Sequence, residues 1–253
     1  MSPDILGLIP AAGKAERLGR LPCSKELLPI GFRETPQGPA PKVACHYLLD
    51  RFRAAGIRRA FLVLHESKWD VARYFGTGEM AGVSLAYLSI PGSRSVPETL
   101  SYAAPWIGGS LVALGFPDCL FEPADAYARL LDRQAATGAD LVLGLFPTAR
   151  SRTTDMVECA PDGRVRRIEV RPQATALRYN WLLAVWGPAF TRFLCEAVSA
   201  SVETDELQIG AVIRAALAAG LHVQGVEIPD GWYRDIGTPG DLAAAVRENA
   251  RLG

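Results

Sequence analysis

Short apolar runs alternate with amphipathic segments along most of this 253-residue chain. The runs are rich in aliphatic residues, which is typical of strands that are buried on both faces of a sheet. The amphipathic segments carry apolar residues at helical spacing, and glycine or proline marks several of their ends. This alternation predicts an α/β fold with a largely parallel sheet. The expected strands are 5–10, 60–64, 83–88, 110–115, 140–146, 181–186 and 223–228. The expected helices are 43–55, 68–75, 98–107, 123–137, 188–200, 206–219 and 239–250.

Two segments interrupt the alternation. Residues 156–159 and 165–170 flank Pro161-Asp162-Gly163, which is a turn sequence, and are predicted to pair as a hairpin. Residues 33–42 are rich in proline and glycine and are predicted to form a loop. Because the hairpin adds antiparallel strands to parallel ones, we expect one domain with a mixed sheet.

The amino-acid composition argues against some classes of binding partner. Lys plus Arg and Asp plus Glu are 27 each, so no net charge attracts nucleic acid or an anionic membrane. The first apolar run is too short for a membrane helix and has no basic region before it. The five cysteines lie far apart without metal-binding spacing, which favours reduced thiols. We therefore expect a cytoplasmic protein with no nucleic-acid or membrane partner.

The most informative stretch is residues 7–30, GLIPAAGKAERLGRLPCSKELLPI. An apolar run opens into small residues, which let backbone N–H groups approach an anion closely. Two cations, Arg17 and Lys25, follow and can neutralise phosphate charge. The stretch therefore indicates phosphoryl or nucleotidyl transfer. The candidate nucleotide-binding residues of the loop are Ala11, Ala12, Gly13 and Lys14.

This stretch resembles the signature of the nucleotidylyltransferases that make NDP-sugars from sugar 1-phosphates. The likeness is strongest to the uridylyl and thymidylyl branch. The signature reads small-x-Gly-x-Gly-Thr-Arg, and then Pro-x-(Ser/Thr)-Lys-x-x-x-Pro. Arg17, Lys25 and Pro29 match it, whereas Ala15 and Glu16 replace the second glycine and the threonine. The alternative is that the two matching cations are ordinary surface residues.

The resemblance extends over nearly the whole chain and implies its architecture. The family has a Rossmann-like three-layer α/β sandwich with a mixed, mostly parallel sheet. We therefore expect residues 1–253 to form one catalytic domain. Bifunctional members continue into a β-helix built from hexapeptide repeats. This sequence shows no such repeats, so we expect no C-terminal β-helix domain.

Two aspartates match the metal ligands of this family. Asp118 follows the apolar run LVALGFP, at the carboxyl end of a predicted strand, where open α/β sheets bind ligands. Asp235 lies in GWYRDIGTP, which is similar to the family's Trp-x-Asp-x-Gly-Thr-Pro. The resemblance implies that Asp118 and Asp235 hold Mg²⁺ together with phosphate oxygens and water. Taken alone, Asp118 also fits a turn residue, and Asp235 fits an anion near the start of the next helix.

The acceptor region departs from the family pattern. Arg171-Pro172 stands where the family has Lys-Pro, and Arg171 can bind the acceptor phosphate with a bidentate fork. Val170 replaces the glutamate that contacts sugar hydroxyls. Val96 stands in place of a glycine near the base, and Trp181 is bulky for an acceptor-binding strand. The resemblance thus predicts the transfer chemistry but leaves the base and the acceptor open.

The expected enzyme transfers a nucleoside monophosphate from an NTP, with UTP or dTTP favoured, to a sugar 1-phosphate. Its partners would be the NTP and a small phosphorylated acceptor, and a homo-oligomer remains an option. One alternative is a cytidylyltransferase that acts on a non-sugar phosphate such as phosphocholine. Another is a regulatory homologue that binds nucleotides without catalysis. A dinucleotide-dependent oxidoreductase fits least, because only Gly13 of the required glycines is present at the loop.

Overall fold

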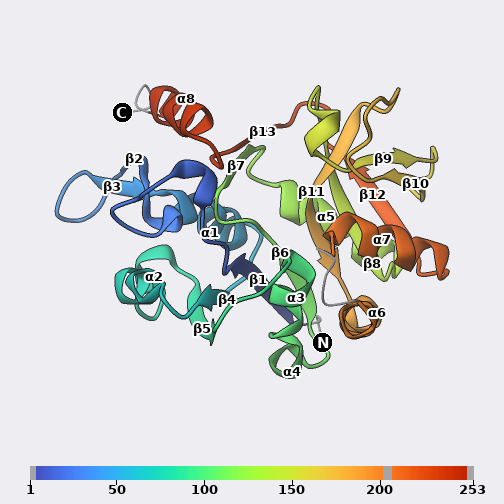
Figure 1. The fold of residues 1–253 in the computed structure, drawn as a ribbon, viewed down its shortest axis with the longest axis horizontal. Helices are drawn as coiled ribbons and strands as arrows, with labels where there is room; N and C mark the ends of the chain where they lie inside the picture. The colour runs from blue at the N-terminus through green and yellow to red at the C-terminus, as the bar shows by residue number, and fades with distance from the viewer. Residues whose placement is uncertain (1–3, 202–206, 250–253) are drawn as a thin grey trace.

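A nine-stranded mixed sheet runs through the part of the chain that the computed structural model describes, residues 4–201 and 207–249 (Figure 1). Its strands are β1 (Ile5–Ala11), β4 (Arg59–His65), β5 (Ser84–Ile90), β6 (Leu111–Leu114), β8 (Leu141–Pro147), β9 (Met156–Cys159), β10 (Val165–Glu169), β11 (Tyr179–Trp186) and β12 (Val223–Glu227). Parallel pairs join β1 to β4 and β6, β4 to β5, and β8 to β12. Strand β11 runs antiparallel to β6, β8 and β9, and it therefore connects the two parallel blocks.

Helices cover both faces of the sheet and complete three layers. One face carries α1 (Ala44–Ala54), α2 (Trp69–Phe75) and α5 (Ala126–Thr137). The other carries α3 (Val96–Ser101), α4 (Ala104–Ile107), α6 (Pro188–Ala200) and α7 (Ile209–Ala218). Successive residues of a strand point to opposite faces. Leu8 and Ile9 of β1 accordingly enter different cores, and both are fully buried. The predicted α/β sandwich is confirmed.

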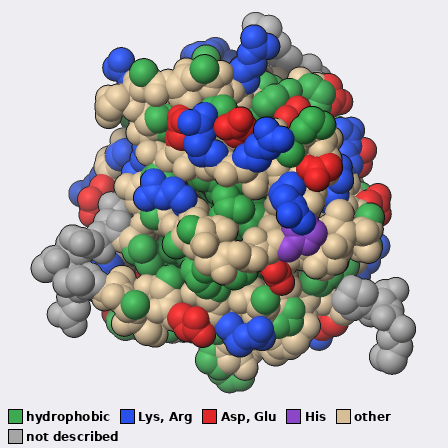
Figure 2. All heavy atoms as spheres, turned by 90° about the vertical axis from the view of Figure 1, so that its right-hand side faces the viewer, with side chains coloured by type: hydrophobic (Ala, Val, Ile, Leu, Met, Phe, Trp, Pro, Cys, Tyr) green, Lys and Arg blue, Asp and Glu red, His purple; other side chains and the backbone are tan. Residues whose placement is uncertain are grey.

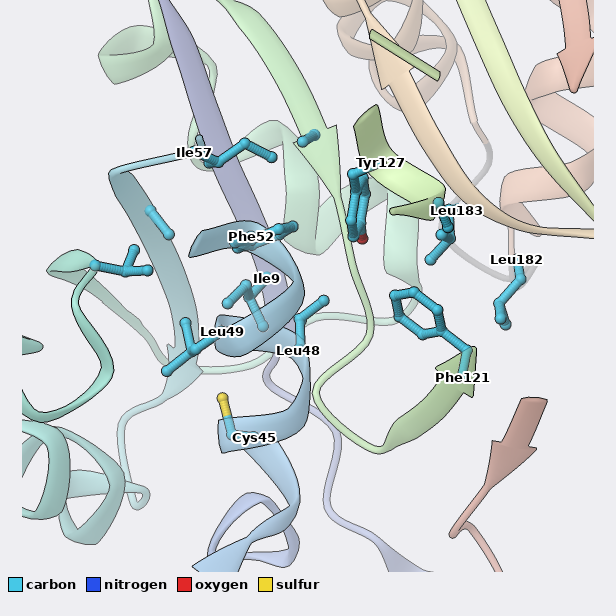
Figure 3. Close-up of a cluster of buried hydrophobic side chains, with 14 of the residues drawn as sticks. Ile9, Cys45, Leu48, Leu49, Phe52, Ile57, Phe121, Tyr127, Leu182 and Leu183 are labelled. Carbon is cyan, nitrogen blue, oxygen red and sulfur yellow. The ribbon is translucent and has the colours of Figure 1, made fainter. Parts of the chain in front are cut away.

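The core on the α1 face also fixes the end of β6 (Figure 3). Figure 3 shows Leu48 and Phe52 of α1 directed toward Ile9 of β1 and Tyr127 of α5. The rings of Phe52 and Tyr127 lie 5.0 Å apart between centroids. The Tyr127 hydroxyl donates a hydrogen bond to the Leu114 carbonyl at 2.7 Å. Because Leu114 is the last residue of β6, this bond holds the start of the segment that leads to the candidate site.

Two small antiparallel sheets stand apart from the large one. Strands β2 (Pro29–Arg33) and β3 (Ala40–Val43) form a hairpin, so the predicted loop over 33–42 is wrong at its ends. Here strand pairing overrides the proline and glycine signal. Strands β7 (Cys119–Glu122) and β13 (Trp232–Asp235) form the second pair, which the sequence patterns did not predict. Helix α8 (Pro239–Asn249) follows β13 and packs beside β2, at the upper left of Figure 1.

Several predicted boundaries differ from those observed. The helix expected over 98–107 is divided into two short helices, α3 and α4. Pro105 lies in the first turn of α4, a position that favours proline. The helix expected over 123–137 begins at Ala126. The helix expected from Glu206 begins at Ile209, and Glu206 itself lies outside the described residues, as does Ala250. The predicted hairpin after residue 155 is confirmed as β9 and β10.

The surface mixes charges of both signs. Figure 2 shows the face that lies on the right in Figure 1, and there Lys and Arg side chains lie among Asp and Glu side chains. Arg167 of β10, for example, pairs with Glu158 at 3.1 Å and with Glu169 at 3.2 Å. Among the described helices, none is long and apolar enough to span a membrane.

Candidate active site

The loop after β1 leaves the sheet at the carboxyl ends of the parallel strands. Ala11 ends β1 beside Leu64 of β4, and Ala11 and Ala12 are buried. Gly13 and Lys14 are exposed beyond them. A Cβ atom on Gly13 would meet no atom within 4 Å. The space above Gly13 is thus open to a ligand, as a phosphate-binding loop requires.

Ala15 adopts the left-handed conformation, with φ 57° and ψ 31°. This conformation favours glycine, and the family signature has glycine at this position. The chain thus keeps the backbone turn that the signature requires while carrying alanine in it. The turn leads into the short 3₁₀ helix η1 (Glu16–Leu18), which carries Arg17 on the surface.

Lys25 opens a second 3₁₀ helix, η2 (Lys25–Leu27), and its ammonium group bonds to Asp118. The two side chains are largely enclosed, with 18% and 13% exposed. Burial alone would lower the pKa of Lys25, but the carboxylates of Asp118, Glu26 and Asp235 outweigh it and raise the pKa above the ordinary value. Lys25 is therefore a fixed positive charge at this point.

The β7–β13 pair brings the two predicted metal-binding aspartates together. Cys119 of β7 lies directly opposite Asp235 of β13, and Asp118 immediately precedes β7. The backbone N–H of Ile236 donates to the Asp118 carbonyl at 3.0 Å. One oxygen of each aspartate and the Cys119 sulfur all lie within 4.8 Å of one another. Residues more than 100 positions apart along the chain thus share one site.

These carboxylates lie close enough to repel each other. Burial raises the pKa of Asp235, and the Asp118 carboxylate raises it further, while Lys25 and Arg17 partly offset both effects. Gly237 makes room for the arrangement. A Cβ atom at Gly237 would lie 2.7 Å from Nη2 of Arg17 and 3.0 Å from Oδ2 of Asp235.

The residues present fit a magnesium ion. Two carboxylates held together with their charges only partly offset by Lys25 and Arg17 favour a divalent cation, and Mg²⁺ usually takes one or two carboxylates plus phosphate oxygens and water. The neighbouring thiol of Cys119 is not a ligand that Mg²⁺ prefers. Burial raises the pKa of Cys119 well above its ordinary value, so it stays a neutral thiol. Asp118 and Asp235 are therefore the residues that would hold the ion.

Two cavities meet the lysine–aspartate cluster from different sides. The first, of about 340 Å³, lies between the loop after β1 and the start of α2, and Lys14, Lys25 and His65 line it. The second, of about 250 Å³, lies against β11 and contains Asp118, Asp235 and Arg171. Lys25 and Asp118 bond to each other, and each lines one of the cavities.

The second cavity holds Asn180, which precedes Trp181 on the strand expected to bind the acceptor, and Asp155, which sequence reasoning missed. Asn180 is 2% exposed, and its Oδ1 has no hydrogen-bond partner among the described residues. Asp155 accepts a bond from Nε1 of Trp181 at 3.3 Å, while its Oδ1 also lacks a partner there. The rings of Phe116 and Trp181 lie 6.3 Å apart on the same wall. Nothing in the local sequence of Asp155 indicated this role, because its partner comes from a distant strand.

Arg171 lies at the mouth of this cavity, in the left-handed region with φ 41°. A non-glycine residue held in this region is often part of a functional site. Arg171 also lines an adjoining cleft of about 650 Å³ with Arg17, Arg150 and Arg152. The cleft thus gathers four arginines around Asp235. Arg150 and Arg152 come from the segment around η4 (Ser151–Thr153) and were not predicted.

Comparisons with known proteins identify the family and a similar fold. A family model described as "Nucleotidyl transferase" matches residues 6–251. A solved structure from Bacillus anthracis, assigned as a glucose-1-phosphate thymidylyltransferase and determined in complex with a sucrose, is similar with a TM-score of 0.82. The two sequences are 17% identical, and the match covers 98% of this chain and 96% of that one. A search of curated protein sequences finds no match.

Proposed function

Because the chain belongs to the nucleotidyl transferase family, we propose that it transfers a nucleoside monophosphate from UTP or dTTP to a sugar 1-phosphate, with release of pyrophosphate. This proposal rests on the ion pair between Lys25 and Asp118, because Lys25 lines the first cavity and Asp118 lines the second. At this junction Lys25 can hold an NTP phosphate, and Asp118 can hold a metal ion beside it. The structural neighbour assigned as a glucose-1-phosphate thymidylyltransferase supports the choice of substrates by analogy.

The transfer needs positioned charges rather than a protein nucleophile. The NTP would lie over the loop after β1, with Lys25 on its α-phosphate and Arg17 on its β- and γ-phosphates. Arg171 would hold the acceptor phosphate, whose second pKa is about 6, so this phosphate is already ionised near neutral pH. An acceptor oxygen then attacks the α-phosphorus in line, the new P–O bond forms, and the bond to pyrophosphate breaks. No general base is required, which suits a site without a catalytic histidine.

Asp118 and Asp235 would hold Mg²⁺ at this junction. When bound, the ion would neutralise charge on the phosphate oxygens. The aspartates themselves keep Lys25 protonated and orient its ammonium group. Burial and, second to it, the Asp118 carboxylate raise the pKa of Asp235, and a cation would relieve the repulsion between the two carboxylates.

The second cavity supports a polar acceptor. The two oxygens that lack partners, on Asn180 and Asp155, lie beside an aromatic wall. A buried acceptor atom left unpaired costs about 1–3 kcal/mol, so a ligand that donates hydrogen bonds to these oxygens, once a side-chain rotation exposes them to the cavity, is favoured. Sugar hydroxyls are such donors, and a sugar face can pack on Trp181. Asn180 and Asp155 can thus supply hydrogen bonds to a sugar that Val170, which replaces the family's glutamate, cannot form.

The same residues favour a second candidate, an acceptor that carries a cationic nitrogen, such as phosphocholine. Burial raises the pKa of Asp155, although the bond from Trp181 and the charge of Arg171 partly offset this. A carboxylate beside two aromatic rings suits an ammonium group.

A pyrophosphate-release screen tests the proposal. Five NTPs are combined with a panel of sugar 1-phosphates and with phosphocholine, with Mg²⁺ present and with chelator as the control. We expect release with UTP or dTTP and a sugar 1-phosphate. Release only with CTP and phosphocholine would select the second candidate. Tight nucleotide binding without release in any combination would indicate the regulatory homologue.

Beyond the chemistry, we propose that residues 1–253 act as one catalytic domain in the cytoplasm. Size-exclusion chromatography with light scattering would establish whether that domain assembles as a homo-oligomer.

A further inference from the structure

Several polar contacts join the segment that carries Lys25 to the start of α2. The backbone N–H of Ser24 donates to Oδ2 of Asp70 at 2.7 Å, and the Ser24 hydroxyl donates to Oδ1 of Asp70 at 2.7 Å. Both oxygens of one carboxylate thus bind one residue. Burial alone would raise the pKa of Asp70, but these bonds and one from the Val71 N–H lower it below its ordinary value. The carboxylate is therefore held ionised.

A buried ion pair makes a second link on the other side of Lys25. Nζ of Lys68 lies 2.8 Å from Oε1 of Glu26, and the two side chains are 8% and 0% exposed. Oε2 of Glu26 has no partner among the described residues. A pair of this kind adds little net stability, because removing two charges from water costs about as much as their attraction returns. Its presence beside the candidate site calls for another explanation.

The two links place Lys25 between fixed neighbours. Residues 24 and 26 bond to residues 70 and 68 of α2 and its N-cap, whereas the Lys25 side chain extends to Asp118. We infer that Asp70 and the Glu26–Lys68 pair are positioning residues, which set where the Lys25 ammonium group stands relative to Asp118. Only the kinetic consequence of this inference rests on the proposed function, because the position of Lys25 can be measured without substrate.

The first test reads the position of Lys25 without any turnover. Trace labelling with acetic anhydride, followed by peptide mapping, measures the reactivity of each lysine. In the wild type we expect slow labelling of Lys25, because its ammonium group is enclosed and bonded to Asp118. Asp70→Ala should raise this reactivity several-fold, toward the level in Asp118→Asn, while the reactivity of Lys42 stays constant as an internal reference. Unchanged Lys25 reactivity in a folded Asp70→Ala protein would overturn the inference.

The second test is kinetic. Asp70→Ala should lower kcat by roughly 10- to 100-fold with little change in either KM, because a misplacement of about 1 Å can cost on this order. Asp125→Ala is the control, since Asp125 is likewise an aspartate at the start of a helix, but it is exposed and its ion pair is with Arg129 of its own helix. Asp70→Glu should recover part of the rate if the carboxylate acts through position. A change confined to KM would contradict the assignment.

A double substitution keeps the inference testable if Asp70→Ala fails to fold. Glu26→Gln with Lys68→Met removes both buried charges together, which avoids leaving one unpaired. We expect this protein to fold and to show raised Lys25 reactivity with lowered kcat. Wild-type values of both quantities would overturn the role of the pair. If the wild type shows no pyrophosphate release with any substrates, the proposed function fails, and the labelling still decides the position of Lys25.

Discussion

At the scale of single residues, Gly13 and Ala15 in the loop after β1 show that the fold and a bound ligand place different demands on side-chain size. Gly13 has no neighbour within 4 Å of a Cβ position and is not among the residues with positive φ. Ala15, two positions later, does adopt positive φ although it carries a Cβ. The fold therefore tolerates a side chain at residue 13, whereas a bound nucleotide would not.

Gly13→Ala is predicted to leave stability unchanged or slightly raised and to weaken NTP binding. The added methyl group meets no protein atom, and alanine has less freedom than glycine in the unfolded chain, but the methyl group occupies the space where a phosphate would approach the backbone. We expect an unfolding midpoint at or slightly above that of the wild type and a KM for the NTP raised by at least about 10-fold, which corresponds to about 1.4 kcal/mol. Gly109→Ala is the matched control, since a Cβ there also meets nothing and lies far from the site. Equal NTP kinetics in both variants would contradict a nucleotide at this loop.

Ala15→Gly is predicted to be neutral or stabilising. An L-residue in the left-handed region costs about 1–2 kcal/mol, and the greater freedom of glycine in the unfolded chain returns about 0.5–1 kcal/mol of that. The same change at Ala136, an exposed position within α5, should destabilise by about 1 kcal/mol. Urea unfolding of the two variants measures the difference. A loss of stability at Ala15 as large as at Ala136 would show that the turn is not strained.

At the scale of elements, the β7–β13 ladder creates the site. Sequence motifs identified Asp118 and Asp235 separately, but only the pairing of these strands places their carboxylates side by side. Each strand has four residues and no clear alternation of apolar and polar positions. Patterns along the chain could therefore not reveal the pairing.

The larger strands were predictable for the opposite reason. Their apolar runs are buried on both faces by helices, so the pattern in the sequence directly records the packing. The links of Ser24 to Asp70 and of Glu26 to Lys68 join residues 46 and 42 positions apart. No local signal records such contacts. The sequence thus indicates which residues carry charge at the site, and the tertiary fold decides which of them meet.

Asp235→Asn is predicted to abolish most turnover while stabilising the protein at neutral pH. The folded-state pKa of Asp235 is raised above its ordinary value of 3.8. Its ionisation therefore opposes folding. The protonated carboxyl group costs the folded protein nothing below the ordinary pKa, and stability is lost as the pH rises from that pKa through the folded-state pKa. The stability difference between Asp235→Asn and the wild type should grow with pH over this acidic range and then level off. Unfolding free energies measured in chelator from pH 4 to 8 give the comparison.

The exposed Asp230 provides the control for this prediction, because it lies on the same approach to β13 and makes only a long contact with Arg129 at 3.6 Å. Asp230→Asn should leave turnover unchanged. If Asp235→Asn instead lowers stability at pH 7, favourable interactions hold the carboxylate, and burial and the Asp118 carboxylate do not raise its pKa.

At the scale of the whole molecule, the two cavities lie on different blocks of the sheet, and we propose that each binds one substrate. The first cavity is built from the loop after β1 and the start of α2, on the N-terminal block of parallel strands. The second is built from β11 and the segments around Arg171, on the C-terminal block. The β7–β13 pair carries the aspartates where the two blocks meet. Substitutions in the two blocks should therefore affect different substrates.

Lys14→Ala and Arg171→Ala form the matched pair that tests this division. Each removes one exposed cation, but Lys14 lines the first cavity and Arg171 lines the second. A hydrogen bond to a charged group contributes about 1.5–3 kcal/mol, so its loss should raise one KM by roughly 10- to 150-fold. We expect Arg171→Ala to raise the KM for the acceptor and Lys14→Ala to raise the KM for the NTP, each with little effect on the other substrate. Arg171→Lys should retain part of the acceptor affinity, since it keeps the charge but loses the bidentate fork. If both alanine variants raise the same KM, the two cavities do not serve different substrates, and the division between the blocks is wrong.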